Sequence, residues 1–254
     1  MAQVYGKPFA KVYNQLWGTF AQKVAKPIMK FYQQQEISKT NKNVLDICCG
    51  TGQLALEFLQ ENYYVLGVDL SPYMLFYARK NNKEFIKKGL AEFRAVNASD
   101  FSLETKFGLA ISSYDAINHL EGTPLIKDCF QCVYNSVVRK GYFIFDLNTR
   151  LGLERWNSIN INESKKFLLI IKGVFDRENN RAITRASGFI KEEDSNLYSP
   201  FEEVVYNYAY DMSEIRKLLK STGWRNIYFA GINNLNTKIK NPEKEERVFI
   251  IAQK

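Results

Sequence analysis

The chain has 254 residues, of which 46% are hydrophobic and 14% aromatic, and it carries a formal net charge of +8. This composition excludes a disordered or fibrous protein and suffices for one α/β domain, with or without a small insertion. No apolar run reaches the roughly 18 residues that a membrane helix needs, and the N-terminus lacks the layout of a secretory signal. We therefore expect a cytoplasmic protein without a membrane partner.

The positive charge is scattered, with short lysine groups at 87–88, 165–166 and 238–240. A nucleic-acid partner is one interpretation of such a charge. No arginine-rich arm or base-stacking motif accompanies it, so we favour a solvated basic surface.

The four cysteines predict free thiols in a reducing compartment. Cys129 and Cys132 have the spacing of a redox pair or of half a zinc site, but they fall in a helical stretch and no second pair of ligands follows. We therefore favour helix packing for these cysteines and predict no metal.

The first part of the chain predicts helices and then a regular alternation of strands and helices. Residues 8–34 have a helical period with a break expected at Pro27, and a polar linker follows. The expected strands begin at residue 44 and then cover 64–69, 93–97, 107–113 and 141–147. The helices expected between them cover 53–62, 71–88 and 124–138. This alternation predicts a doubly wound, mostly parallel sheet.

The rhythm changes after residue 148. Three β-rich stretches follow one another without helices, at 167–175, 182–191 and 203–210. They predict an antiparallel insertion. The last expected elements are an amphipathic helix ended by a glycine cap and two strands, at 213–222, 225–231 and 247–252.

The run Val44-Leu-Asp-Ile-Cys-Cys-Gly-Thr-Gly-Gln53 is an apolar strand that turns into a glycine-bearing loop and then into a helix. Gly50 and Gly52 let a ligand approach the backbone, and unpaired helix amides face it. Asp69 ends the next strand about twenty residues on, where a ribose-binding acid is expected. These features alone match a dinucleotide site.

Two further acids disfavour a nicotinamide cofactor. Asp46 precedes the loop, where a nicotinamide fingerprint usually has apolar residues, and Asp100 with Phe101 ends the third strand, where the pair could hold an adenine. The alternative for Asp69 and Asp100 is that they cap the helices after them. Asp46 could equally orient the loop without touching a ligand.

Together these residues resemble the class I S-adenosylmethionine-dependent methyltransferases. The matching segments are 44–52, 68–72, 98–101, 107–120 and 141–148. The resemblance implies a Rossmann-like, seven-stranded, mostly parallel sheet with an antiparallel last strand. It also implies one methyltransferase domain over 1–254, divided into an N-terminal helical lid (1–42), a cofactor-binding core (43–148), an antiparallel β insertion over the substrate site (149–211) and a C-terminal part of the sheet (212–254).

The resemblance further implies S-adenosylmethionine as cofactor and S-adenosylhomocysteine as product. The glycine loop would receive the methionine part, Asp69 the ribose, and Asp100 with Phe101 the adenine. The residues expected to bind the cofactor are Tyr13, Trp17, Asp46, Cys48, Gly50, Gly52, Asp69, Leu70, Met74, Ser99, Asp100, Phe101, Ser113 and Tyr114.

Tyr114 to Leu120 and the N-terminal Val12-Tyr-Asn-Gln-Leu-Trp17 look like the small-molecule branch that includes amino-sugar and glycine N-methyltransferases. In that branch a tyrosine-bearing N-terminal helix covers the cofactor, although Asn14 replaces the aspartate that relatives tend to carry. Tyr13 and His119 are the predicted catalytic residues, and ordinary packing is the alternative for Tyr13, for Trp17 and for this single histidine. The predicted substrate contacts are Asn118, His119, Asn148, Trp156, Arg185, Tyr206 and Tyr208.

The sequence thus predicts methyl transfer to a nitrogen, or an oxygen, of a small molecule by a monomer or homodimer. An RNA or protein methyltransferase is the second hypothesis, and the net charge is its main support. A non-catalytic S-adenosylmethionine-binding protein is the third, and an NAD-linked oxidoreductase is a minor one.

Overall fold

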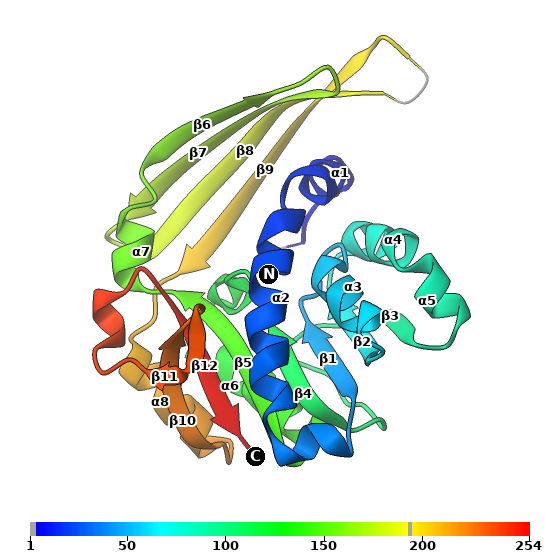
Figure 1. The fold of residues 1–254 in the computed structure, drawn as a ribbon. Coiled ribbons are helices and arrows are strands. Elements are labelled where there is room, and N and C mark those ends of the chain that lie inside the picture. The colour runs from blue at the N-terminus through cyan, green and yellow to red at the C-terminus, as the bar shows by residue number, and fades with distance from the viewer. Residues whose placement is uncertain (1–3, 193–194) are drawn as a thin grey trace.

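The computed structural model describes residues 4–192 and 195–254. A mixed sheet lies between two layers of helices, and a second, antiparallel sheet projects beyond one of its ends (Figure 1). The order of the main sheet is β11-β10-β12-β5-β4-β1-β2-β3. Its strands are β1 (Asn43–Ile47), β2 (Tyr64–Asp69), β3 (Ala91–Ala95), β4 (Phe107–Ser112), β5 (Val137–Asn148), β10 (Arg225–Gly231), β11 (Asn234–Lys238) and β12 (Arg247–Gln253).

The strand directions confirm the predicted fold class. β1, β2, β3, β4 and β5 pair in parallel, whereas β12 pairs antiparallel with both β5 and β10. All six residues of β4 are buried, as expected for a parallel strand with helices on both faces. The sheet has eight strands within the described residues, one more than predicted, because β11 turns back on β10 as an edge hairpin.

Helices cover both faces of the main sheet. α2 (Gly18–Gln33), α3 (Gln53–Gln60) and α4 (Pro72–Asn81) pack on one face, and α6 (Thr123–Ser136) and α8 (Met212–Ser221) pack on the other. The remaining helical segments are α1 (Lys7–Leu16), η1 (Glu36–Lys39), α5 (Lys83–Lys87), η2 (Ala116–His119), α7 (Arg150–Glu154) and η3 (Pro242–Lys244). Cys129 and Cys132 lie on α6, and Cys129 is part of the core.

The expected helix break at Pro27 is wrong. α2 continues through Pro27, and the chain instead breaks at Trp17, whose amide donates to the carbonyl of Tyr13 at 3.0 Å. A proline inside a helix costs about 3 kcal/mol. Val24 and Ile28 are fully buried on either side of it, and each such side chain contributes about 1.5–3 kcal/mol, so packing outweighs the lost hydrogen bond.

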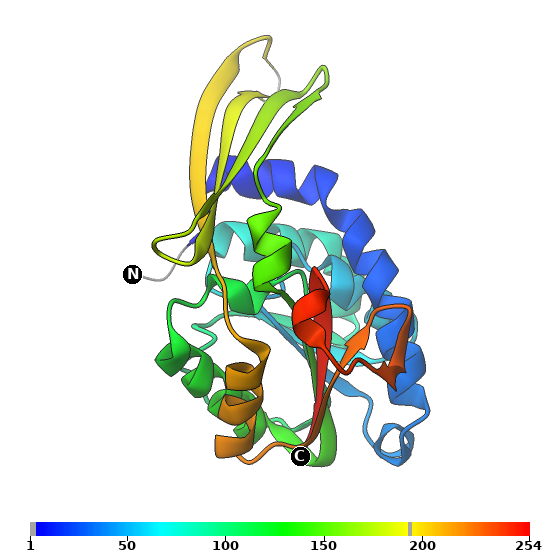
Figure 2. The same ribbon diagram turned by 90° about the vertical axis from the view of Figure 1, so that its left-hand side faces the viewer.

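The second sheet has four antiparallel strands in chain order, one more than predicted. They are β6 (Ser158–Glu163), β7 (Phe167–Asp176), β8 (Arg181–Lys191) and β9 (Tyr198–Tyr208). The inner face packs on α1, where Phe9, Ala10 and Val12 are buried against Leu169 and Phe201. α1 lies between this sheet and α4, so helix and sheet together cover one end of the main sheet (Figure 2).

Candidate active site

A cavity of about 480 Å³ opens at the carboxyl ends of β1, β2 and β4. The loop after β1 and the start of α4 form one end of the cavity. Tyr5 and Phe9 from the N-terminal segment, η2, Trp156 and the inner face of the second sheet form the other end. The carboxyl edge of a parallel sheet is where ligands bind in this architecture. We call the first the donor end and the second the acceptor end, after the methyl donor and methyl acceptor that the sequence predicts.

The loop after β1 needs its glycines. Gly50 and Gly52 have φ values of 53° and 73°, in the left-handed region. A Cβ on Gly52 would come within 2.7 Å of Asn82 Nδ2 and 3.0 Å of the Ala78 Cβ on α4. The loop therefore packs directly on α4, and its backbone turns toward the cavity.

Asp69 connects this loop to α4. Its Oδ2 accepts from the amide of Gly50 at 2.8 Å, and its Oδ1 accepts from the amide of Ser71 at 2.8 Å. The residue that caps α4 is Ser71, whose Oγ accepts from the amide of Met74 at 3.3 Å, and Asp69 lines the cavity. Burial raises the pKa of the Asp69 carboxyl, and the backbone hydrogen bonds oppose that rise.

Asp46 lies under the same loop and is only 2% exposed. Among the described residues its Oδ2 has no hydrogen-bond partner. Burial, and then the nearby Asp69, raise the pKa of Asp46 to about 8. Asp46 lines a smaller cavity of about 30 Å³ that shares Tyr13 and Gly50 with the main one. A buried acceptor without a donor is costly, so this carboxyl favours a donor group on a ligand.

Most residues predicted to bind the cofactor line the main cavity: Tyr13, Trp17, Cys48, Gly50, Asp69, Leu70, Met74, Ser99, Ser113 and Tyr114. Gly52, Asp100 and Phe101 do not. Asp100 is exposed, and its amide donates to the carbonyl of Asn97 at 3.0 Å in a turn. That turn brings Asn97, not Asp100, to the wall of the cavity. The position of Asp100 and Phe101 outside the cavity wall therefore does not support the adenine contact predicted for them.

His119 ends η2 and faces the acceptor end. Its Nδ1 lies 2.8 Å from the carbonyl oxygen of Tyr206 on β9. A carbonyl can only accept, so we assign the proton of the neutral ring to Nδ1 and the lone pair to Nε2. Burial lowers the pKa of His119, and the nearby Asp115 carboxylate opposes this. The imidazole is therefore neutral at neutral pH, with Nε2 as its basic atom.

Of the predicted substrate contacts, His119, Trp156 and Tyr208 line the cavity. Asn118 and Asn148 do not, because they bond each other. The amide of Asn148 donates to Asn118 Oδ1 at 3.0 Å, and Asn118 Nδ2 donates to the carbonyls of Asn148 and Tyr208. These two asparagines join η2, β5 and the end of β9.

Arg185 and Tyr206 also lie outside the cavity. Side chains alternate along a strand, and in the β8–β9 ladder Arg185 pairs with Val204 and Ile183 with Tyr206 on the outer face. Arg185 forms an ion pair with Glu202 there. The inner face instead places Thr184, Val205 and Asn207 on the cavity wall. The two-residue period was visible in the sequence, but it does not say which face is inner.

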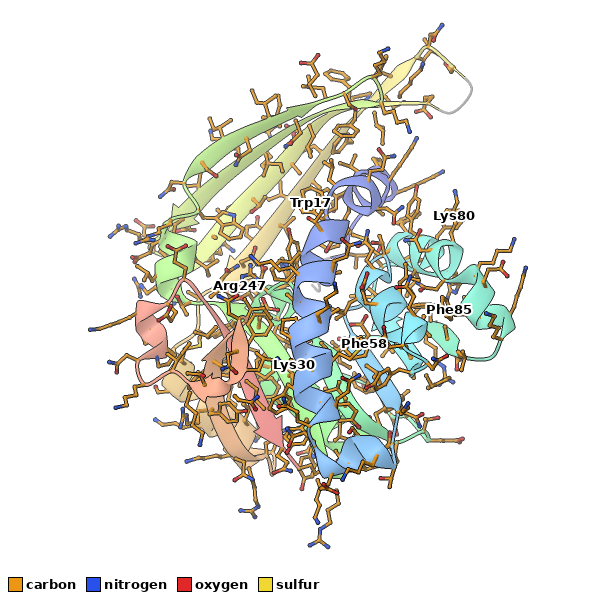
Figure 3. The ribbon with its side chains drawn as sticks, in the orientation of Figure 1. Trp17, Lys30, Phe58, Lys80, Phe85 and Arg247 are labelled. Carbon is orange, nitrogen blue, oxygen red and sulfur yellow. The ribbon has the colours of Figure 1, made fainter. Side chains whose placement is uncertain are left out.

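Arg247 at the start of β12 is a cavity residue that the sequence did not single out (Figure 3). Its Nη2 lies 2.6 Å from Asp115 Oδ1, and its Nη1 forms an ion pair with Asp146. Asp146 is fully buried, and its carboxylate also accepts from the amides of Tyr114 and Asp115. Both of these residues have positive φ, so the network fixes an uncommon backbone conformation just before η2.

The other polar or aromatic wall residues that sequence reasoning missed are Tyr5, Phe9, Ser71, Asn97, Asp115, Glu121, Thr184 and Asn207. Acidic side chains in this wall are Asp69, Asp115 and Glu121, and its one arginine, Arg247, is already paired with two carboxylates. The wall therefore favours a neutral or cationic ligand over an anionic one.

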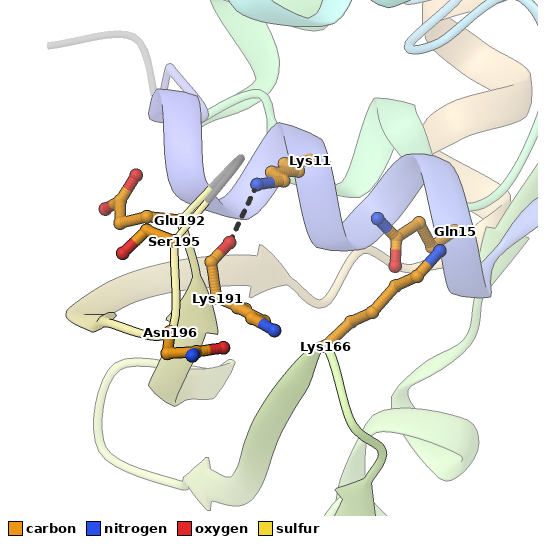
Figure 4. Close-up of a pocket in the computed structure, with 7 residues that line it drawn as sticks. All are labelled: Lys11, Gln15, Lys166, Lys191, Glu192, Ser195 and Asn196. Carbon is orange, nitrogen blue, oxygen red and sulfur yellow. Dashed lines mark hydrogen bonds between the residues drawn. The ribbon is translucent and has the colours of Figure 1, made fainter.

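A second pocket, of about 550 Å³, is open and lies between α1 and the far end of the second sheet (Figure 4). Its wall includes Lys11, Lys166 and Lys191, and Lys11 donates to the carbonyl of Lys191 at 3.1 Å. It contains none of the predicted site residues.

The described helices include none that is long and apolar enough to cross a membrane.

Comparison with known proteins agrees with this geometry. Residues 44–141 match the methyltransferase domain family. A Geobacillus sp. protein named as a methyltransferase is 23% identical over 94% of this chain and 92% of its own length. An S-adenosylmethionine-dependent methyltransferase from Clostridium acetobutylicum superposes with a TM-score of 0.77 at 23% identity, covering 97% of both chains.

The sugar N-methyltransferase KedS8 from Streptoalloteichus superposes with a TM-score of 0.75 at 14% identity, covering all of this chain and 94% of its own. Residues 44–141 thus match a methyltransferase domain, and the whole chain shares its fold with S-adenosylmethionine-dependent methyltransferases. The roles of individual residues follow as proposals.

Proposed function

We propose that the protein transfers a methyl group from S-adenosylmethionine to a nitrogen of a small-molecule amine. The observation that carries this proposal is the acceptor end of the cavity. A neutral histidine faces it, acidic side chains line it, and its one arginine is already paired. The sulfonium supplies a methyl group with its leaving group attached, so the chain has only to hold, align and desolvate the reactants.

At the donor end, the unpartnered Oδ2 of Asp46 and the exposed side of the glycine loop fit the charged amino-acid part of the cofactor. Asp69 retains lone pairs for the ribose hydroxyls, and Asn97 has the amide geometry that adenine pairs with. Tyr13 and Trp17 from the N-terminal helices cover this end. Their rings are 5.2 Å apart, and the electron-rich faces of such rings favour a nearby cation.

At the acceptor end, the requirement is a nucleophile with a free electron pair. An amine that enters as an ammonium ion has to lose a proton first, and His119 is the neutral base placed to take it. Asp115 and Glu121 favour the entry of the ammonium form. A phosphate or carboxylate next to the reacting nitrogen would meet like charges instead.

The wall also supports a small acceptor over a macromolecule. The N-terminal segment is bonded to both sides of the cavity, because Ser71 Oγ donates to the carbonyl of Tyr5 and the amide of Gly6 donates to Glu203 on β9. A cavity of about 480 Å³ has to hold the cofactor and the acceptor together. It is within the range of small-molecule sites, about 300–1,000 Å³.

The test is turnover of methyl-tritiated S-adenosylmethionine with matched acceptor pairs: small amines and amino sugars, each beside the analogue with hydroxyl in place of the amino group. We expect label transfer to the amines and little to the alcohols. Transfer to hydroxyls alone would replace nitrogen by oxygen in this proposal. Labelling of RNA or protein with no labelled small product would overturn it.

A further inference from the structure

His119 has one ring nitrogen available for proton transfer. Nδ1 already carries the proton that it donates to the carbonyl of Tyr206. Any proton that reaches the imidazole therefore has to arrive at Nε2. The hydroxyl of Tyr5 lies 3.4 Å from Nε2, and the two rings meet edge to face at 81° with centroids 6.1 Å apart. Both side chains line the cavity, so the Tyr5 hydroxyl lies beside the basic atom at the acceptor end.

Tyr5 is fixed in this place by contacts that do not involve His119. Its carbonyl accepts from Ser71 Oγ at 2.7 Å, and its ring stacks on Phe9 with centroids 4.8 Å apart. The amide of the next residue, Gly6, donates to Glu203 Oε2 at 3.2 Å. An acceptor that pushed the hydroxyl aside would have to disturb these contacts as well.

We propose that Tyr5 is a further catalytic residue of the methyl transfer proposed above, through which the proton of the acceptor reaches His119. The acceptor nitrogen gives its proton to the Tyr5 oxygen while the Tyr5 hydroxyl proton passes to Nε2. Tyr5 begins and ends as a neutral phenol, one positive charge moves from the acceptor to the imidazole, and the nitrogen is left with a free electron pair. The inference rests on the proposed function for the acceptor.

The electrostatics of the segment suit this role. Burial and the nearby carboxylates of Asp115 and Asp69 raise the pKa of the Tyr5 phenol well above its usual value, so it stays protonated and can donate. Ser71, which bonds Tyr5, lies two positions after the end of β2, so the relay is complete when the N-terminal segment is docked beside the donor end. Cofactor binding and proton removal are thereby linked through one residue.

The first test needs no acceptor, because the chain has a single histidine. Nitrogen-labelled histidine in untagged protein gives one imidazole, whose tautomer and pKa can be followed by NMR. The groups that face it within residues 4–192 and 195–254 include Asp115, the Tyr206 carbonyl and the Tyr5 hydroxyl. We expect the Nδ1-protonated form in the wild type. Tyr5→Phe should shift the Nε2 signal and raise the pKa of His119, because the hydroxyl stabilises the neutral ring. An unchanged signal and pKa would overturn the contact.

The second test is kinetic, with the amine that the wild type methylates best. Tyr5→Phe keeps the ring and its stacking and should lower kcat by about a hundredfold or more. The dissociation constant of S-adenosylhomocysteine should change by less than about twofold, since the hydroxyl contacts the base and not the donor-end loop. Adding His119→Gln to Tyr5→Phe should lower kcat little further, because the two residues act as one unit.

The matched control is Tyr142→Phe, which also removes a hydroxyl that makes hydrogen bonds, here to Gln35 and Gln253, far from the cavity wall. It should leave kcat unchanged. Wild-type kcat in Tyr5→Phe would overturn the relay and leave the proposed function standing. If NMR shows the contact between the Tyr5 hydroxyl and Nε2 but no amine is methylated, the proposed function is overturned, and the relay with it.

Discussion

The donor and acceptor ends of the cavity are built in different ways. Most of the donor end comes from residues 46–74, where one loop and one helix start are held together by the carboxylate of Asp69, and Asn97, Tyr13 and Trp17 lie around it. The acceptor end joins Tyr5, His119, Asn207 and Arg247, which come from four separate elements. Its connections are ion pairs and hydrogen bonds of side chains that span up to 197 residues of sequence.

The difference teaches where each kind of specificity resides. Backbone groups in the donor end can bind a ligand that never changes, and a short motif suffices to make them. The acceptor end depends on how the second sheet and the N-terminal segment dock, so its shape can change while the donor end stays intact. Substitutions at the two ends should therefore affect different measurements.

His119→Gln should give the largest effect, and only at the acceptor end. Loss of a general base lowers turnover by about 10²–10⁴-fold. Rapid kinetics should show this loss in kcat, and calorimetry with S-adenosylhomocysteine should show nearly unchanged affinity. A parallel loss of cofactor affinity would mean that the two ends are not separate.

The Arg247→Met substitution should have the next largest effect. It tests the ion pairs that connect the elements of the acceptor end. Removing one partner of a buried ion pair costs about 3–5 kcal/mol, because the carboxylates of Asp115 and Asp146 are left uncompensated. Urea unfolding should show this loss in the free energy of unfolding. The control, Arg155→Met, breaks an exposed pair with Glu246 and should cost at most about 1 kcal/mol. Equal losses in both variants would contradict the importance of the buried network.

Asp69→Ala should weaken cofactor binding. Each hydrogen bond to a charged group contributes about 1.5–3 kcal/mol, so calorimetry should show at least about a tenfold loss of S-adenosylhomocysteine affinity. Asp100→Ala is the matched control, since Asp100 is exposed and outside the cavity wall. A loss in Asp100→Ala as large as in Asp69→Ala would restore the adenine contact predicted from the sequence.

The pH dependence should give the smallest effect near neutrality. The base has to be neutral, and burial lowers the pKa of His119 below its usual 6.5. The kcat profile should therefore be flat around pH 7 and fall by about tenfold per unit only at pH values below that pKa. A profile that rises through pH 7 to 8 would show that His119 is not the titrating group.

The donor end could be predicted because its determinants are local. Gly50, Gly52 and Asp69 follow strands that the apolar pattern already revealed, and Ser71 with Pro72 marked the start of α4. Asp100 differs from them, because the turn after β3 exposes its side chain and presents Asn97 to the cavity, which no local pattern indicates.

The acceptor end could not be predicted because its determinants are pairwise and distant. Nothing local tells that Arg247 meets Asp115 and Asp146, or that Tyr5 reaches His119. β6 was missed because every residue in it is exposed, which leaves no buried side to mark it. Pro27 misled because the local rule for proline takes no account of how deeply the flanking residues are packed.

Asn118 has a consequence for engineering. Its side chain bonds the backbone of Asn148, where the chain leaves the main sheet, and the carbonyl of Tyr208, where it returns. The departure and return points of a segment of about sixty residues are thereby pinned at one spot, and loop closure over them costs little more as the segment grows. We expect that the second sheet can be replaced by that of a relative if Asn118 and these two junctions are kept. Such a chimera would carry a different acceptor-binding surface on the same main sheet.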